Sequence, residues 1–186
     1  KSEWVPKGMV GVCNPCTWTA TDHRPTTRVD LYRSVVNGPT DASVADLEGA
    51  VLTDVVFRIP AAHLADAQAP HAPVHQYRFD WRSPAWGGMI GAAHAVEIPF
   101  VFEMVADERL HVFVGPDAPR GLAACMHAAW VSFARDGAPT LADGTPWPTI
   151  DADGRPVVLF DAETTVASDP QGATRRFWAG AGSLIG

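Results

Sequence analysis

The chain has 186 residues, of which 47% are hydrophobic and 19% are charged, and its formal net charge at pH 7 is −7. This hydrophobic content excludes a disordered chain, and 16 Gly and 16 Pro without a regular period exclude a collagen-like one. The lysines are Lys1 and Lys7 alone and the arginines are scattered, so we do not expect nucleic acid as a partner. No apolar run approaches the roughly 20 residues of a membrane span, so we expect no membrane partner either.

A chain of this length buries about 70% of its unfolded surface, which supports one substantial core but not two full-sized domains. The cysteines are Cys13, Cys16 and Cys125, too few and oddly numbered for a secreted disulfide framework. The sequence leaves the compartment open, with the cytoplasm slightly favoured.

The first expected element is a short buried strand over residues 9–13, where an apolar run stops at an Asn-Pro pair. The polar stretch 20–41 contains Pro and Gly and is expected to be connecting structure. Ser43, followed three residues later by Asp46, is typical of a helix N-terminus.

Apolar residues then recur at helical spacing until Pro60, which predicts a break or kink near residues 58–60. A second helix is expected over 61–68. The alternation of apolar and polar residues over 74–81 is the best strand signal in the chain, and a Gly/Ala-rich loop over 83–95 follows it.

The segment 118–136 is the best helix signal, with Pro119 suited to its first turn and Gly137 to its C-terminal end. Its apolar spacing predicts one buried face made of Leu122, Met126, Trp130 and Phe133. A short strand is expected over 157–160 and a final helix over 170–179. Strands that alternate with helices predict an α/β fold.

Five segments stand in a recognisable order: FRIPA at 57–61, YRFDWRSP at 77–84, GAAHAVEIPFVF at 91–102, WVSFARDGAP at 130–139 and WP at 147–148. Together they resemble the C-terminal part of the type B carboxylesterases. This α/β-hydrolase family includes bacterial p-nitrobenzyl esterases and the cholinesterases. The resemblance runs from about residue 52 to residue 178 and, more weakly, back to Met9.

The resemblance implies the C-terminal portion of an α/β-hydrolase fold, with a partial sheet and flanking helices. It also implies that His94 is the general base of a serine hydrolase that acts on small-molecule esters. Glu97 matches an acidic position of the family, where it would tie the loop by hydrogen bonds or support His94. Trp86 and Met89 flank the histidine loop and would either line a substrate pocket or pack. This chemistry needs no metal and no organic cofactor.

The family's nucleophile has no counterpart in this sequence. No serine has Gly at both −2 and +2, so the Gly-x-Ser-x-Gly elbow is missing, and the oxyanion loop is missing too. In the family, both lie in the N-terminal part. We therefore expect residues 1–186 to be a single C-terminal segment of a longer enzyme.

The acid of the catalytic triad is also in question. Without gaps, Cys16 aligns with the family's glutamate, and a neutral thiol does not stabilise an imidazolium as a buried carboxylate does. Asp22 and Asp30 are alternative acids that the spacing does not support. Either the alignment is shifted at this end or the triad is broken.

Two other functions remain open. One is a non-catalytic interaction module, because the α/β-hydrolase family includes cell-adhesion proteins that keep the fold and lose triad residues. The other is a dithiol redox domain built on Cys13 and Cys16, which form a Cys-x-x-Cys motif after a predicted strand. A zinc site is less favoured because structural zinc needs four ligands.

A sheet cut through its middle would leave one strand edge unpaired and part of the core uncovered. We therefore expect the chain either to self-associate or to require the N-terminal part of the same enzyme.

Overall fold

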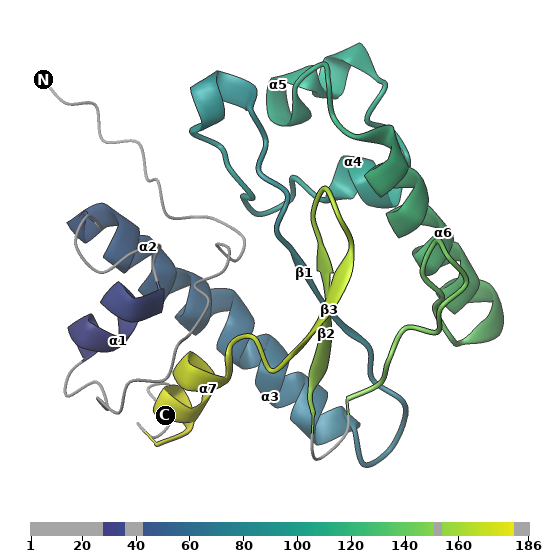
Figure 1. Cartoon of the computed structure of the whole chain (residues 1–186). Coiled ribbons are helices and arrows are strands. Elements are labelled where there is room, and N and C mark those ends of the chain that lie inside the picture. Colours follow the sequence, from purple (N-terminus) through teal and green to yellow (C-terminus); the bar gives the residue numbers. More distant parts are fainter. Residues whose placement is uncertain (1–27, 36–42, 151–153, 181–186) are drawn as a thin grey trace, which may run out of the picture.

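The computed structural model describes residues 28–35, 43–150 and 154–180 (Figure 1). The expected strand at 9–13 and the Cys13/Cys16 motif lie outside these residues. The elements follow in this order: α1 (Arg28–Val35), α2 (Val44–Thr53), η1 (Asp54–Arg58), α3 (Ile59–Gln68), β1 (Gln76–Phe79), η2 (Ala85–Gly88), α4 (Ile98–Val101), η3 (Glu108–Leu110), α5 (His111–Val114), α6 (Arg120–Asp136), β2 (Pro156–Phe160), β3 (Thr165–Ser168) and α7 (Gly172–Gly180).

The three strands form one small mixed sheet in the order β1-β2-β3. β1 runs parallel to β2, with Gln76 opposite Val157, and β3 runs antiparallel to β2, with Thr165 opposite Leu159. The predicted strands at 74–81 and 157–160 are confirmed as β1 and β2, whereas β3 was not predicted. Among the described residues β1 pairs on one side only, so it forms an edge of the sheet.

The segment from α2 to α3 is a continuous helical rod beside the sheet (Figure 1). Its start is the predicted cap: the Ser43 side chain accepts the Asp46 N–H, and the Asp46 carboxylate accepts the Ser43 N–H. The predicted break takes the form of η1, a π-helical turn in which the Ile59 N–H bonds the Asp54 carbonyl. Pro60 then lies in the first turn of α3 and has no N–H to continue the helical bonding of the rod, so the irregular π turn falls directly before it.

The helix α6 is close to the prediction at both ends. Gly137 has a left-handed backbone, φ 71°, and its N–H closes the helix on the Phe133 carbonyl. Pro119 is the residue before the first turn rather than part of it. The predicted face is partly wrong: Leu122 and Met126 are buried, but Phe133 is 51% exposed. The buried stripe is completed by small side chains instead, namely Ala123, Cys125, Ala129 and Ser132.

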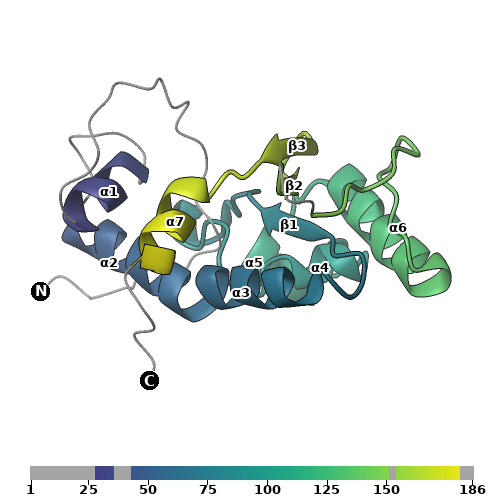
Figure 2. The ribbon, with the colours of Figure 1, turned by 90° about the horizontal axis from the view of Figure 1, so that it is seen from below.

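The main core lies between α6 and one face of the sheet. Tyr77 faces α6, where its ring meets Trp130 at a centroid distance of 5.0 Å. Arg78 points to the opposite face, beside Arg58 and Ala62 of the rod. The sheet is therefore flanked by α6 on one side and by α3 on the other (Figure 2). The core cluster comprises Phe79, Ala92, Val96, Phe100, Val105, Val114, Ala118, Leu122, Ala123, Cys125, Met126, Ala129, Trp147, Val158 and Phe160.

The first and last described helices lie side by side (Figures 1 and 2). A buried chain of hydrogen bonds fastens them to the rod: Trp178 Nε1 donates to the Tyr32 hydroxyl over 2.7 Å, and that hydroxyl donates to Asp54 over 2.6 Å. The expectation that 20–41 is only connecting structure is therefore wrong for α1. Although its sequence is polar, two of its residues, Leu31 and Tyr32, are buried by tertiary contacts. They are 3% and 1% exposed.

The loop predicted over 83–95 is confirmed as mostly irregular, with the short 3₁₀ turn η2 inside it. The final helix predicted over 170–179 is confirmed as α7. The short helices between 98 and 114 carry too little periodicity to be predicted. Within the described residues, no helix combines the length and the apolarity that a bilayer crossing requires.

Candidate active site

His94 lies in a tight turn that joins the loop after β1 to α4. The next residue, Ala95, has a left-handed backbone with φ 73°, and the Val96 N–H closes the turn on the Ala93 carbonyl over 3.1 Å. Ala92 and Val96, on either side, are 2% and 3% exposed and belong to the core. The backbone of the turn is therefore anchored on both sides while the imidazole is exposed.

The base of the loop that leads to His94 is closed by backbone and side-chain hydrogen bonds. Ser83 pairs with Gly91 across the loop, and the buried Ser83 hydroxyl donates to the Phe113 carbonyl. Such pairing at the base limits how far the histidine turn can move relative to α5.

The ring of His94 stacks on the ring of Phe57, which η1 carries from the helical rod. The two ring centroids are 5.0 Å apart and the planes are 25° from parallel. Within residues 28–35, 43–150 and 154–180, the His94 ring has no hydrogen-bond partner. Sequence reasoning missed this contact, because FRIPA at 57–61 marked the family but gave Phe57 no role.

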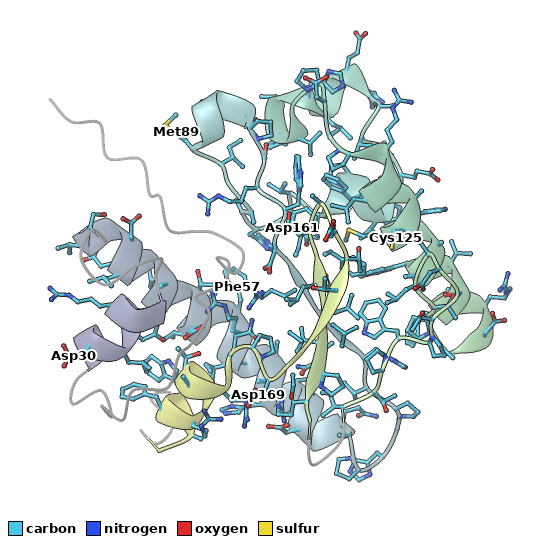
Figure 3. The ribbon with its side chains drawn as sticks, in the orientation of Figure 1. Asp30, Phe57, Met89, Cys125, Asp161 and Asp169 are labelled. Atoms are coloured by element: carbon cyan, nitrogen blue, oxygen red, sulfur yellow. The ribbon has the colours of Figure 1, made fainter. Side chains whose placement is uncertain are left out.

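Met89 lies on the outer part of the loop and is 46% exposed (Figure 3). Trp86, in the 3₁₀ turn η2 of the same loop, is 63% exposed. Trp86 has a left-handed backbone, φ 56°, and its Nε1 donates to the Val112 carbonyl over 2.9 Å. The indole thus ties the loop to α5. A role for either side chain in lining a substrate pocket stays a prediction.

Glu97 starts α4 through its main chain. Its carbonyl accepts the N–H groups of Phe100 and Val101, each over 3.0 Å. Burial raises the pKa of the Tyr77 hydroxyl, and the negative charge of Glu97 adds to that rise. These bonds lie within α4, so both roles of the Glu97 side chain, tying the loop and supporting His94, stay predictions.

A buried ion pair stands where β1 ends and the histidine loop begins. Arg78 donates to both carboxylate oxygens of Asp80, and the two side chains are 6% and 2% exposed. Burial raises the pKa of the Asp80 carboxyl, while the Arg78 guanidinium acts in the opposite direction. The pair fixes the direction in which the chain leaves the sheet.

A model of the carboxylesterase family matches residues 26–178. The chain belongs to this carboxylesterase family. It is 34% identical over 129 residues to the para-nitrobenzyl esterase of Bacillus subtilis, which covers 68% of this chain and 26% of that protein. It is 36% identical over 123 residues to the phenmedipham hydrolase of Pseudarthrobacter oxydans, which covers 64% of this chain and 25% of that protein.

Solved carboxylesterase structures also resemble the chain. A carboxylesterase of Geobacillus stearothermophilus aligns with a TM-score of 0.68 and 33% identity, over 81% of this chain and 31% of the other. A thermophilic p-nitrobenzyl esterase aligns with a TM-score of 0.63 and 26% identity, over 86% of this chain and 35% of the other. These likenesses confirm the predicted partial α/β-hydrolase fold. The chain spans about a quarter of the length of the two curated relatives above.

Among the described residues, no hydrogen bond joins a serine side chain to His94. Four serines spend their side chains on bonds elsewhere: Ser43 caps α2, Ser83 donates to the Phe113 carbonyl, Ser132 to the Ala129 carbonyl and Ser168 to the Gly154 carbonyl. Of the predicted alternative acids, Asp30 is exposed on α1, and Asp22 lies outside the described residues together with Cys13 and Cys16. No group of three or more His, Cys, Asp or Glu suited to a metal occurs in the described part of the chain.

Proposed function

We propose that this chain supplies the general base, His94, of a carboxylic ester hydrolase of the serine-hydrolase type. The observation that carries the proposal is an exposed imidazole on an anchored turn after a strand of a parallel pair. Functional groups of open α/β sheets gather at the carboxyl ends of their parallel strands. The carboxylesterase family motif at 91–102 contains this turn, and the motif at 77–84 precedes it.

In the proposed reaction, a serine hydroxyl attacks the ester carbonyl while His94 takes its proton. The tetrahedral intermediate then collapses, the C–O bond to the alcohol breaks, and His94 returns the proton to the departing alkoxide. Water attacks the acyl-enzyme by the same route, with His94 again as the base. In this proposal the serine and the oxyanion donors come from sequence outside this chain. The acid stays open, because Cys16 stands at the family's acid position only in an alignment without gaps.

The edge of the sheet at β1 is accessible to the remaining part of such an enzyme. A groove of about 510 Å³ runs along β1 between α3 and α6. Two of the side chains that line it, Leu64 and Phe133, are 72% and 51% exposed. Exposed apolar walls beside an edge strand support the proposal that the N-terminal part of the enzyme, or a second copy of the chain, covers this edge.

The first experiment is intact-mass analysis after treatment with a fluorophosphonate, which labels activated serines. The chain is tested alone and then joined to the N-terminal part of a type B carboxylesterase, where that family carries its elbow serine. We expect no adduct on the chain alone and one adduct on the joined protein. The His94→Ala variant should slow the labelling and the hydrolysis of p-nitrophenyl acetate by at least about a hundredfold.

The matched control is His63→Ala, which removes an exposed histidine from α3 and should leave both rates unchanged. An adduct on the chain alone would mean that it holds a complete serine site, and the proposed division of the site would be wrong. A joined protein that folds but stays unlabelled would favour the function of a non-catalytic interaction module over that of a hydrolase. A reactive thiolate at Cys13 or Cys16 would then favour the dithiol function instead.

A further inference from the structure

We propose that Phe57 is a positioning residue that holds the His94 imidazole in the orientation needed for proton transfer. The inference rests on the proposed function of His94 and adds to it a residue from a different element. It starts from the ring stack between η1 and the histidine turn, with 5.0 Å between centroids and 25° between planes.

The stack matters because the His94 side chain has little else to orient it in the described structure. Its backbone is anchored by the buried Ala92 and Val96, but the imidazole itself is exposed. An exposed side chain exchanges rotamers freely unless a neighbour restricts it. The flat face of Phe57 supplies that restriction and leaves the edge of the imidazole, which carries both nitrogens, available for proton transfer.

Phe57 is itself held by the buried start of η1. Asp54, three residues earlier, is fully buried and accepts hydrogen bonds from Tyr32 over 2.6 Å and from Arg58 over 2.7 Å. The π-helical turn widens the rod at this point, and single π turns in otherwise regular helices occur frequently at functional sites. The network around Asp54 therefore fixes the turn that carries Phe57 to His94.

The contact also suits the charge that the proposed reaction creates. When His94 takes the serine proton, the imidazole becomes a cation whose face lies against an aromatic ring. A cation over an aromatic face is attracted by the negative potential of the ring. Phe57 thus favours the protonated state that exists only while the intermediate forms, in addition to limiting ring rotation.

The first test is NMR of the full chain, observing the carbon-bound ring protons of His94. A ring stacked over Phe57 shifts these protons upfield, so Phe57→Leu should move them downfield and Phe57→Tyr should not. Phe133→Leu is the matched control, because Phe133 makes an edge-to-face ring contact with a different histidine, His75, at a centroid distance of 6.1 Å. It should shift the His75 protons and leave those of His94 in place. Unchanged His94 signals in Phe57→Leu would overturn the proposal without reference to any activity.

The second test is steady-state hydrolysis by the chain joined to the N-terminal part of a type B carboxylesterase. Phe57→Leu should lower kcat about threefold to tenfold and leave KM within about twofold, because only the proton-transfer step depends on the ring. Phe57→Tyr should keep kcat within about twofold of the parent. A Phe57→Leu protein with unchanged kcat would refute the positioning role while the function of His94 stands. Full activity of His94→Ala would instead refute the proposed function.

Discussion

Arg78 and Asp80 form a two-point ion pair at the end of β1, in which both nitrogen–oxygen distances are 2.6 Å. The residues are separated only by Phe79, and in an extended chain residues two apart lie on the same face, which brings the two side chains together. Because both charges are buried, each one depends on the other for the stabilisation that water would otherwise give.

We expect Asp80→Asn to lower the free energy of unfolding by about 3 kcal/mol, since it leaves the Arg78 cation buried without its counter-charge. Urea unfolding followed by circular dichroism measures the change. The control is Asp136→Asn in the exposed pair Arg135–Asp136, where solvent screens the interaction and no change is expected. Equal effects of the two variants would contradict the buried character of the pair at β1.

The hydroxyl of Tyr32 accepts one hydrogen bond and donates another within a buried site. We expect Tyr32→Phe to destabilise the chain by about 1–3 kcal/mol, because Trp178 Nε1 and Asp54 each lose a partner. Thermal unfolding is the readout. Tyr77→Phe is the natural control, since no described group bonds the Tyr77 hydroxyl and its side chain is 41% exposed. A Tyr77→Phe protein as unstable as Tyr32→Phe would argue against the network.

Asp107 offers a pH-dependent prediction. Hydrogen bonds from the Arg109 side chain and backbone lower the pKa of this carboxyl to about 2. A carboxyl with a lowered pKa stabilises the folded state at pH values above its unfolded pKa. That contribution is lost as the pH falls through the folded pKa. NMR titration of the carboxyl carbon should give this low value in the parent chain.

In Arg109→Gln, the pKa of Asp107 should return toward its usual range, whereas that of Asp136, lowered by its own partner Arg135, should not move. Added salt should reduce the shift at Asp107, because the Asp107–Arg109 pair is exposed. A pKa at Asp107 that does not respond to Arg109→Gln would contradict the assigned cause.

Two glycines of α6 should respond to alanine in opposite directions. Gly137 has φ 71°, which an L side chain rarely adopts, so Gly137→Ala should cost about 1 kcal/mol of stability. Gly121 is the second residue of α6, with no atom within 4 Å of an added Cβ, and Gly121→Ala should stabilise by about 0.5 kcal/mol. Chemical unfolding of the pair measures both signs, and the same sign for both would be the contrary result.

The features that sequence reasoning predicted are those with local causes. The Ser43 cap with Asp46 and the closure of α6 at Gly137 each depend on chemistry within a few residues. The strand at 74–81 is similarly local, because its alternating pattern matches the period of the strand itself. His94 was placed in a loop by its Gly and Ala neighbours, and its role came from the family motif alone.

The features that were missed depend on residues distant in the sequence. The helix α1 is held by hydrogen bonds of Tyr32 with Asp54 and Trp178, and no local sequence pattern predicts these distant partners. Phe133 was expected inside, but it faces the open groove beside β1. The stack of Phe57 on His94 joins two elements that the sequence shows only as separate motifs.

The hydrogen bond between Tyr32 and Trp178 joins residues 146 positions apart, which gives it a consequence for the order of folding. Closing so large a loop costs more entropy than forming local helical turns, so the α2–α3 rod should form early and the α1–α7 contact late. Substitutions at this contact should therefore accelerate unfolding and leave the refolding rate nearly unchanged. The lifetime of the folded chain would then depend on the contact between α1 and α7, the first and last described helices.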